Sequence, residues 1–206
     1  MSSEMEAAPG GRGGVYPKRV LLFSGKRKCG KDYITDLLLE RIGSKDAVII
    51  KISSPIKSHW AEEKGLDLKQ LMSADEYKER YRQEMILWSE AIRDKDPGCF
   101  CRKAVVMYKA QEKPVWIVSD IRRQTDIAWF TQEYGETVRT IRVAAEEDVR
   151  VKRGYVFTSG IDDKASECDL DKVGNWHWMI NNNGSAEELE KLLDPLIEDI
   201  RSALAE

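Results

Sequence analysis

The stretch of residues 24–32 constrains this chain more than any other, because it lies where a strand pattern turns into a helix pattern. An apolar run precedes it, and an amphipathic helix pattern follows it over about residues 31–41. Gly25, four further residues and then Gly30-Lys31 fit a phosphate-binding loop. Glycines let backbone N–H groups face a phosphate chain, the lysine reaches the outer phosphates, and the helix dipole adds positive potential. The sequence therefore predicts a site for ATP or GTP.

All eight residues of the loop are candidates for contact with the nucleotide: Gly25, Lys26, Arg27, Lys28, Cys29, Gly30, Lys31 and Asp32. Asp32 stands where the motif has a Ser or Thr whose hydroxyl contacts magnesium. A carboxylate is also a hard oxygen ligand, so Asp32 is a candidate Mg²⁺ ligand. The alternatives are a surface turn with Asp32 favouring the helix dipole, and a solvated basic turn at residues 26–28.

Composition restricts the class of protein. The chain has 206 residues, 42% of them hydrophobic, and a net charge of −3, which fits one domain with a substantial core and excludes a strongly basic nucleic-acid binder. No apolar run approaches the roughly 20 residues of a membrane helix, and no signal peptide is recognisable. The four cysteines fit no zinc spacing and are interpreted as free thiols. We expect a cytosolic monomer that acts on a small molecule, without nucleic acid or membrane partners.

Residues 1–17, rich in Gly and Pro, predict a flexible tail, and residues 18–206 predict one domain. Strand patterns alternate with helix patterns along that domain, which predicts an α/β fold of three layers: a five-stranded parallel sheet with helices on both faces. The predicted strands are residues 20–23, 47–52, 114–120, 138–143 and 176–180. The predicted helices are residues 31–41, 55–65, 74–94, 98–109, 125–133, 146–153 and 185–204. The polar stretch of about residues 154–174 is long for a connector, so it is either disordered or functional.

The chain from about Arg19 to Leu204 resembles animal-type phosphomevalonate kinases. The resemblance rests on Leu22-Phe23-Ser24-Gly25-Lys26-Arg27-Lys28 with Gly30-Lys31-Asp32, Asp96-Pro97-Gly98 with Phe100-Cys101-Arg102-Lys103, Val118-Ser119-Asp120 with Arg122-Arg123, and Arg153-Gly154 with Val156-Phe157-Thr158. That family carries Asp at the position of Asp32. The resemblance implies a nucleoside-monophosphate-kinase-like P-loop fold and ATP-dependent, Mg²⁺-dependent conversion of (R)-5-phosphomevalonate to (R)-5-diphosphomevalonate in isoprenoid and sterol synthesis.

Another small-molecule kinase of the same architecture, acting on a nucleoside monophosphate or dephospho-coenzyme A, is the nearest alternative. A GTP-driven switch would have Ser or Thr at Asp32 and an Asn-Lys-x-Asp-type motif, and the sequence has neither. Some family members end in a peroxisomal-type tripeptide, whereas this chain ends Leu204-Ala205-Glu206, which is no such signal.

On the acceptor side, Arg122 and Arg123 follow a strand end, where ligands bind in open α/β sheets, and their guanidinium groups suit phosphate and carboxylate. A helical insertion of about residues 55–110 covers the acceptor in this fold, and the resemblance makes its cations candidates: Lys57, Lys78, Arg82, Arg93 and Arg102. The resemblance also assigns Asn182 to the acceptor. For each of these residues the alternative is ordinary surface pairing or an Asn-rich turn.

On the nucleotide side, Arg150 and Arg153 stand one helical turn apart beside the segment 154–174, which in this fold class is a lid that closes over ATP. Phosphoryl transfer needs charge neutralisation. The predicted catalytic residues are therefore cations: Lys31, Arg122, Arg123, Arg150 and Arg153. The resemblance assigns Asn183 to the nucleotide. Asp120 is a candidate for holding Mg²⁺ through water or for orienting the arginines. The acids of the lid segment are interpreted as solvated charge.

Overall fold

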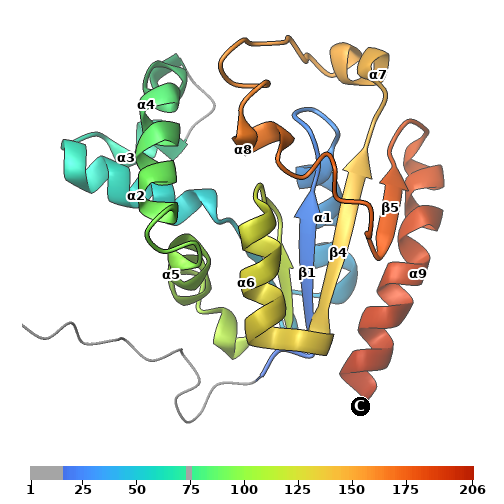
Figure 1. Ribbon diagram of the computed structural model, residues 1–206. Helices are drawn as coiled ribbons and strands as arrows, with labels where there is room; N and C mark the ends of the chain where they lie inside the picture. Colours follow the sequence, from blue (N-terminus) through green and yellow to red (C-terminus); the bar gives the residue numbers. More distant parts are fainter. Residues whose placement is uncertain (1–15, 73–75) are drawn as a thin grey trace, which may run out of the picture.

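The computed structural model describes residues 16–72 and 76–206 (Figure 1). Residues 1–15 of the predicted tail lie outside these ranges. Its last two residues pack on the body: the Tyr16 ring lies 5.9 Å from the Tyr134 ring, centroid to centroid, and Pro17 is buried. Flexibility of the residues before them stays a prediction.

Five strands form one parallel sheet in the order β2-β3-β1-β4-β5 (Figure 1). The strands are β1 (Arg19–Ser24), β2 (Ala47–Ile50), β3 (Val115–Val118), β4 (Val138–Ala144) and β5 (Trp178–Asn181). β1 lies between β3 and β4, so the order of the strands reverses direction around it. In open α/β sheets ligands bind at such a point, beyond the carboxyl ends of the strands. The predicted five-stranded parallel sheet is confirmed.

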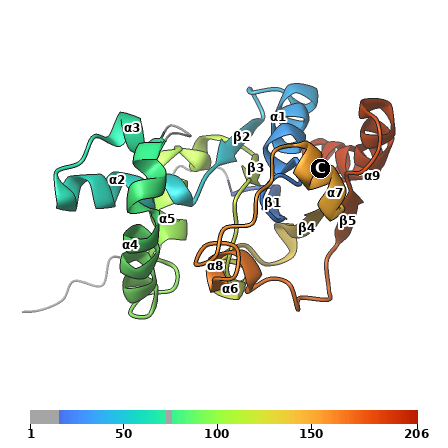
Figure 2. The same cartoon turned by 90° about the horizontal axis from the view of Figure 1, so that it is seen from above.

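Helices cover both faces of the sheet, as Figure 2 shows from above. The helices α1 (Lys31–Ile42) and α9 (Ala186–Ala205) pack on one face, and α5 (Cys99–Met107) and α6 (Gln124–Tyr134) pack on the other. β1 serves both cores because its side chains alternate: Leu21 and Phe23 join the α1/α9 core, whereas Val20 and Leu22 join the α5/α6 core. The three-layer arrangement follows from this alternation.

The helices α2 (Ser53–Lys64), α3 (Leu68–Met72) and α4 (Glu76–Arg93) lie beside the sheet, next to α5 (Figures 1 and 2). They have a small core of their own around Trp60, Leu71 and Met85, and the Trp60 and Trp88 rings meet edge to face at 5.4 Å. The sequence predicted α2, α4 and α5 within a few residues. α3 was missed because five residues are too few to show a helical period.

The chain from α7 (Glu147–Lys152) to β5 passes across the carboxyl ends of the strands (Figure 1). It contains one short helix, α8 (Ala165–Cys168), which the sequence did not predict. Two 3-10 turns, η1 (Ala110–Glu112) and η2 (Gly135–Thr137), precede β3 and β4. Within residues 16–72 and 76–206 no helix is both long and apolar enough to cross a membrane.

Candidate active site

The loop after β1 has two glycines at positions where no side chain fits. A Cβ on Gly25 would lie 2.6 Å from the Cys29 sulfur and 2.7 Å from the Val143 carbonyl oxygen. Gly30 has φ of 90°, in the left-handed region, and a Cβ there would overlap the Asn182 amide. α1 begins directly after it at Lys31. The unpaired N–H groups of the helix start are therefore held at the end of the central strand, as a phosphate site requires.

The basic side chains of the loop are paired with carboxylates from the segment 154–174. Lys26 Nζ lies 2.5 Å from the Asp171 carboxylate and also donates to the Glu167 carbonyl oxygen at 2.7 Å. Arg27 Nη1 lies 2.9 Å from the Asp162 carboxylate. Lys28 is exposed, at a φ of 63°. The interpretation of the segment's acids as solvated charge is thus wrong for Asp162 and Asp171, which are the counter-ions of the loop, and for Glu167, which is buried and paired with Arg122.

Arg150 and Arg153 converge on the backbone of the same loop. Arg150 Nε donates to the Arg27 carbonyl oxygen at 2.9 Å, and its guanidinium lies 3.8 Å from the centre of the Tyr155 ring. Arg153 Nη1 donates to the Cys29 carbonyl oxygen at 3.2 Å. Both arginines therefore lie against the nucleotide loop in this structure, and their action on ATP stays a prediction.

The two asparagines lie near the loop but away from the large cavity described below. Asn182 is buried and donates from Nδ2 to the Cys29 carbonyl oxygen at 2.8 Å. Asn183 is exposed and accepts the Glu146 backbone N–H, at the start of α7, at 2.8 Å. Asn182 is not among the residues that line the cavity, and its contact with the acceptor stays a prediction.

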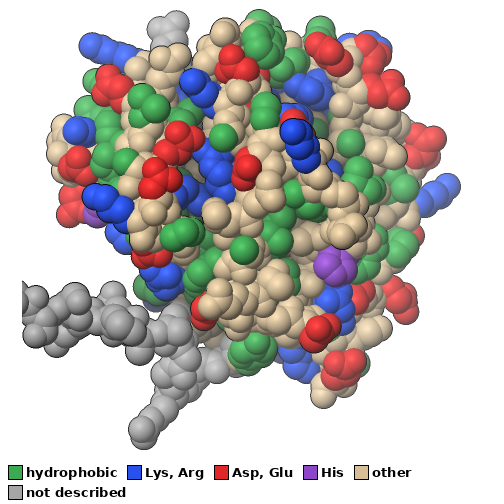
Figure 3. Space-filling model, viewed as in Figure 1, with side chains coloured by type: hydrophobic (Ala, Val, Ile, Leu, Met, Phe, Trp, Pro, Cys, Tyr) green, Lys and Arg blue, Asp and Glu red, His purple; other side chains and the backbone are tan. Residues whose placement is uncertain are grey.

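A cavity of about 360 Å³ opens beside the loop, within the size range of small-molecule sites. Its walls come from α1, the β2–α2 turn, α2, the end of α3, α4, the β3–α6 turn and α8. Figure 3 shows Lys and Arg side chains gathered where the α2–α4 helices meet the sheet domain. Seven cations line the cavity: Lys31, Lys51, Lys57, Arg82, Arg93, Arg122 and Arg123. Three carboxylates line it: Asp32, Asp120 and Glu167. The excess of positive charge suits an anionic ligand.

Arg122 and Arg123 both reach this cavity, from the turn after β3. Arg122 pairs with the Glu167 carboxylate and donates to the Ser166 carbonyl oxygen at 3.2 Å. Arg123 Nη2 lies 2.5 Å from the Glu90 carboxylate, while its Nη1 is buried without a partner among the described residues. Burial lowers the pKa of the Arg123 guanidinium, and Glu90 opposes that shift. An unpaired buried N–H donor is costly unless a ligand accepts from it.

The predicted cations of the insertion separate into two groups. Lys57, Arg82 and Arg93 line the cavity, and Arg82 Nη2 lies 3.7 Å from the Glu167 carboxylate. Arg102 pairs with Asp96 and is not among the lining residues. The side chain of Lys78 lies outside the described part. Arg93 is paired with the buried Asp126 at 2.5 Å.

Asp32 and Asp120 both line the cavity, and they come from different elements of the fold. Asp32 is exposed on the first turn of α1, and Asp120 follows β3. The Asp120 carboxylate accepts the backbone N–H groups of Ile52 at 2.6 Å and Ser53 at 3.1 Å, so it also fixes the start of α2. No group of three His, Cys, Asp or Glu suited to a metal exists in the described part of the chain. Two carboxylates beside a phosphate loop fit Mg²⁺, which usually takes its other ligands from substrate phosphates and water.

Several residues of the site were missed by sequence reasoning. Arg142 donates to the Ser24 hydroxyl and to the Asp171 carboxylate, both at 2.7 Å, and lines a second cavity of about 10 Å³ beside the loop. An arginine near the carboxyl end of a buried parallel strand is the signal that could have found it. Asp126, Glu90 and Glu167 gave no comparable signal, because their partners are distant in sequence.

A cation-lined cavity next to a phosphate-binding loop, at the reversal point of a parallel sheet, defines a P-loop kinase by its class. The family model described as "Phosphomevalonate kinase" matches residues 23–160. A relative from Drosophila melanogaster named "Phosphomevalonate kinase" is 45% identical over 183 residues, which cover 86% of this chain and 96% of the relative. The chain therefore belongs to the phosphomevalonate kinase family.

One solved structure, that of TT1252, supports the fold, and a gluconokinase structure serves for comparison only. The crystal structure of TT1252 from Thermus thermophilus has a TM-score of 0.51 and 19% sequence identity, covering 90% of this chain and 98% of that one. A gluconokinase from Sinorhizobium meliloti 1021 has a TM-score of 0.49 and 12% identity, covering 93% and 97%. At these identities the likeness concerns the backbone arrangement alone.

Proposed function

We propose that this chain transfers the γ-phosphoryl group of ATP to the phosphate of (R)-5-phosphomevalonate, giving (R)-5-diphosphomevalonate and ADP. The observation that carries the proposal, beside family membership, is the cavity lined by seven cations and three carboxylates directly next to the loop lysine. Phosphomevalonate carries a phosphate and a carboxylate on a short aliphatic chain, so it needs cations at two separated points. The walls supply them from the β3–α6 turn and from α2 and α4.

Transfer requires charge neutralisation between donor and acceptor. Lys31 and Arg122 each line both the large cavity and the small one beside the loop, which supports a role for them between the two substrates. In phosphoryl transfer the protein mainly positions the reactants and stabilises charge on the moving group. Lys31 and Arg122 are accordingly assigned to the transferring phosphoryl group. No general base is required, because a phosphate monoester oxygen is already largely ionised at neutral pH.

Mg²⁺ is the proposed cofactor, with Asp32 and Asp120 as the residues that hold it directly or through water. When bound, it supplies neutralisation of phosphate charge on the donor. Asp120 already accepts two backbone N–H groups, which keeps its carboxylate oriented in the site.

The segment 154–174 is proposed as the lid over ATP and α2–α5 as the acceptor cover. Support for the lid comes from the reach of Arg150 and Arg153 to the loop backbone and from the pairing of loop cations with Asp162 and Asp171. Closing such a segment excludes water from the reaction. For the whole chain we propose a cytosolic monomer of the isoprenoid and sterol route, without a nucleic-acid partner. The four free cysteines are compatible with a reducing compartment.

A coupled ADP-release assay with phosphomevalonate, mevalonate and AMP tests the function. We expect turnover with phosphomevalonate only, since mevalonate lacks the accepting phosphate. Turnover of AMP with none of phosphomevalonate would leave the fold and the ATP site standing and refute the acceptor.

A further inference from the structure

Two ion pairs of opposite direction join α4 to the turn between β3 and α6. Glu90 of α4 pairs with Arg123 at 2.5 Å, and Arg93 of α4 pairs with Asp126 at 2.5 Å. Residues three apart share one face of a helix, so Glu90 and Arg93 point the same way from α4. Arg123 and Asp126 are the N-cap and third residue of α6. We call these four residues the α4–α6 clamp.

Asp126 is the buried centre of the clamp. Its side chain is fully buried, and its Oδ2 accepts the backbone N–H groups of Arg122 at 2.9 Å and Arg123 at 3.1 Å. Its Oδ1 accepts from Arg93 and, at 3.6 Å, from the Cys101 thiol. A buried carboxylate is tolerated only when it is paired and hydrogen-bonded, and Asp126 meets both conditions. The Asp126 side chain thus fixes the backbone of Arg122 and Arg123 and the guanidinium group of Arg93.

Glu90 holds one edge of the Arg123 guanidinium and leaves the other edge unused. Nη2 is bound to Glu90, whereas Nη1 is buried without a partner among the described residues. Arg123 and Arg93 line the large cavity, and Glu90 and Asp126 do not. The two acids therefore hold cations that line the cavity without lining it themselves.

We propose that Glu90 and Asp126 are positioning residues for the acceptor. They set the register of α4 against the β3–α6 turn and aim Arg123 and Arg93 at the anionic end of the acceptor. The proposal rests on the proposed function, since it assigns these cations to the phosphomevalonate side. Removing either acid leaves a cation misdirected beside the acceptor, while the loop that binds ATP is untouched.

Glu90→Gln is the first test, because the Glu90 side chain is 35% exposed and its loss should not prevent folding. The KM for phosphomevalonate should rise about 3- to 10-fold, as expected for losing a partly exposed charged pair, while the KM for ATP stays within about 2-fold. Asp126→Asn should act in the same direction and more strongly, about 10- to 100-fold, because its carboxylate is fully buried. Calorimetric titration of each variant with phosphomevalonate alone gives the binding change without turnover.

Glu84→Gln is the matched control, an exposed acid of the same helix that does not line the cavity. It should leave both KM values unchanged, and thermal melting confirms that each variant is folded. If Asp126→Asn does not fold, Glu90→Gln decides alone. An unchanged acceptor KM in folded Glu90→Gln, or an equal rise of both KM values, overturns the positioning role. If wild-type protein fails to turn over phosphomevalonate, the proposed function itself fails, which is a distinct result.

Discussion

The nucleotide side and the acceptor side of the site hold their cations in different ways. On the nucleotide side, Lys26 and Arg27 are paired with Asp171 and Asp162, which lie on a segment that crosses over the loop. On the acceptor side, Arg93 and Arg123 are paired with Asp126 and Glu90, which belong to packed helices. If the segment opens as the proposed lid, the counter-ions of the loop leave with it, whereas those of Arg93 and Arg123 stay in the packed helices.

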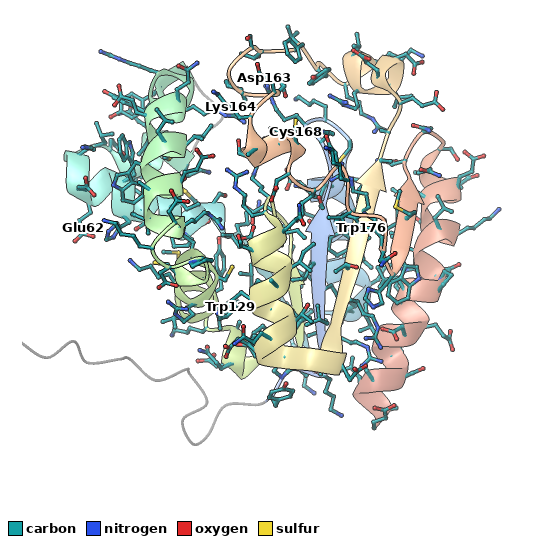
Figure 4. The ribbon with its side chains drawn as sticks, in the orientation of Figure 1. Glu62, Trp129, Asp163, Lys164, Cys168 and Trp176 are labelled. Carbon is teal, nitrogen blue, oxygen red and sulfur yellow. The ribbon has the colours of Figure 1, made fainter. Side chains whose placement is uncertain are left out.

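This difference indicates that the two sides of the site bind their anionic ligands in different ways. The lid segment carries exposed apolar residues such as Val156 and Phe157, and its labelled side chains Asp163, Lys164 and Cys168 lie above the strand ends in Figure 4. Residues 156–159 are all exposed, whereas Tyr155, Ile161 and Leu170 of the same segment are buried, so opening costs least free energy around residues 156–159. We infer that phosphates replace lid carboxylates at the loop, while the acceptor meets cations whose geometry is already set.

The largest effect is expected from Lys31→Met, because Lys31 lines both cavities and so serves both sides of the comparison. Loss of a contact to the transferring phosphoryl group typically lowers turnover about 100-fold or more. We expect kcat to fall by that amount in a folded protein, as measured by ADP release. Lys191→Met, an exposed lysine of α9, serves as the control. Turnover within a few-fold of wild type would remove Lys31 from the reaction.

Arg123→Met tests the acceptor side of the comparison. Its Nη1 is the buried donor without a partner among the described residues, and a charge-assisted hydrogen bond contributes about 1.5–3 kcal/mol. The KM for phosphomevalonate should rise about 10- to 100-fold, with little change in the KM for ATP. Initial-rate measurements varying one substrate at a time separate the two constants. A rise in the ATP constant alone would place Arg123 on the nucleotide side.

The nucleotide side was predictable from the sequence because its parts are local. Strand, loop and helix follow one another within residues 19–42, so spacing alone fixes Gly25, Gly30 and Lys31 in space. The same holds for the sheet, whose apolar runs are continuous because both faces are covered. The lid contacts were not predictable, since Lys26 and Asp171 are 145 residues apart.

The acceptor side was predictable only in part. The sequence pointed to Arg122 and Arg123 because they follow a strand end, and to Lys57 and Arg93 through the family resemblance. All four line the cavity, and their contact with the acceptor stays a prediction. Nothing in the sequence pairs Arg93 with Asp126 or Arg123 with Glu90, because each pair joins two elements 33 residues apart. The resemblance assigned Asn182 to the acceptor, which stays a prediction, and nothing in the sequence showed that its amide donates to the loop backbone.

Asp32→Ala tests whether the two sides share a metal. Asp32 is exposed on the first turn of α1 and lines the large cavity. Its loss should raise the Mg²⁺ concentration that gives half-maximal rate several-fold. The effect is modest because water and substrate phosphates supply the other ligands of Mg²⁺. Titration of Mg²⁺ at saturating substrates measures this. Asp36→Ala, an exposed acid one turn further along α1, is the control. An unchanged titration would leave Asp32 as a residue that only favours the helix start.

The smallest effect is expected from Asp171→Asn, which tests the exchange of lid carboxylates for phosphates directly. Asp171 bonds Lys26 at 2.5 Å and Arg142 at 2.7 Å, and its side chain is 37% exposed, so each pair is a modest contribution. Neutralising it removes a competitor of ATP for both cations, and the KM for ATP should fall about 2- to 5-fold. Without ligands, trypsin should cleave faster after Lys164 and Lys172, because the lid loses an anchor.

Asp163→Asn is the matched control, because Asp163 bonds only Ser159 and Gly160 within the same segment as far as the described contacts show. It should change neither the KM for ATP nor the cleavage rate. ATP should protect the wild-type segment more than it protects Asp171→Asn if the carboxylate and the phosphates compete for Lys26. A higher KM for ATP in Asp171→Asn, with cleavage unchanged, would mean that Asp171 belongs to the ATP-bound arrangement. The loop would then be prepared in the same way as the acceptor side, by counter-ions that stay in place.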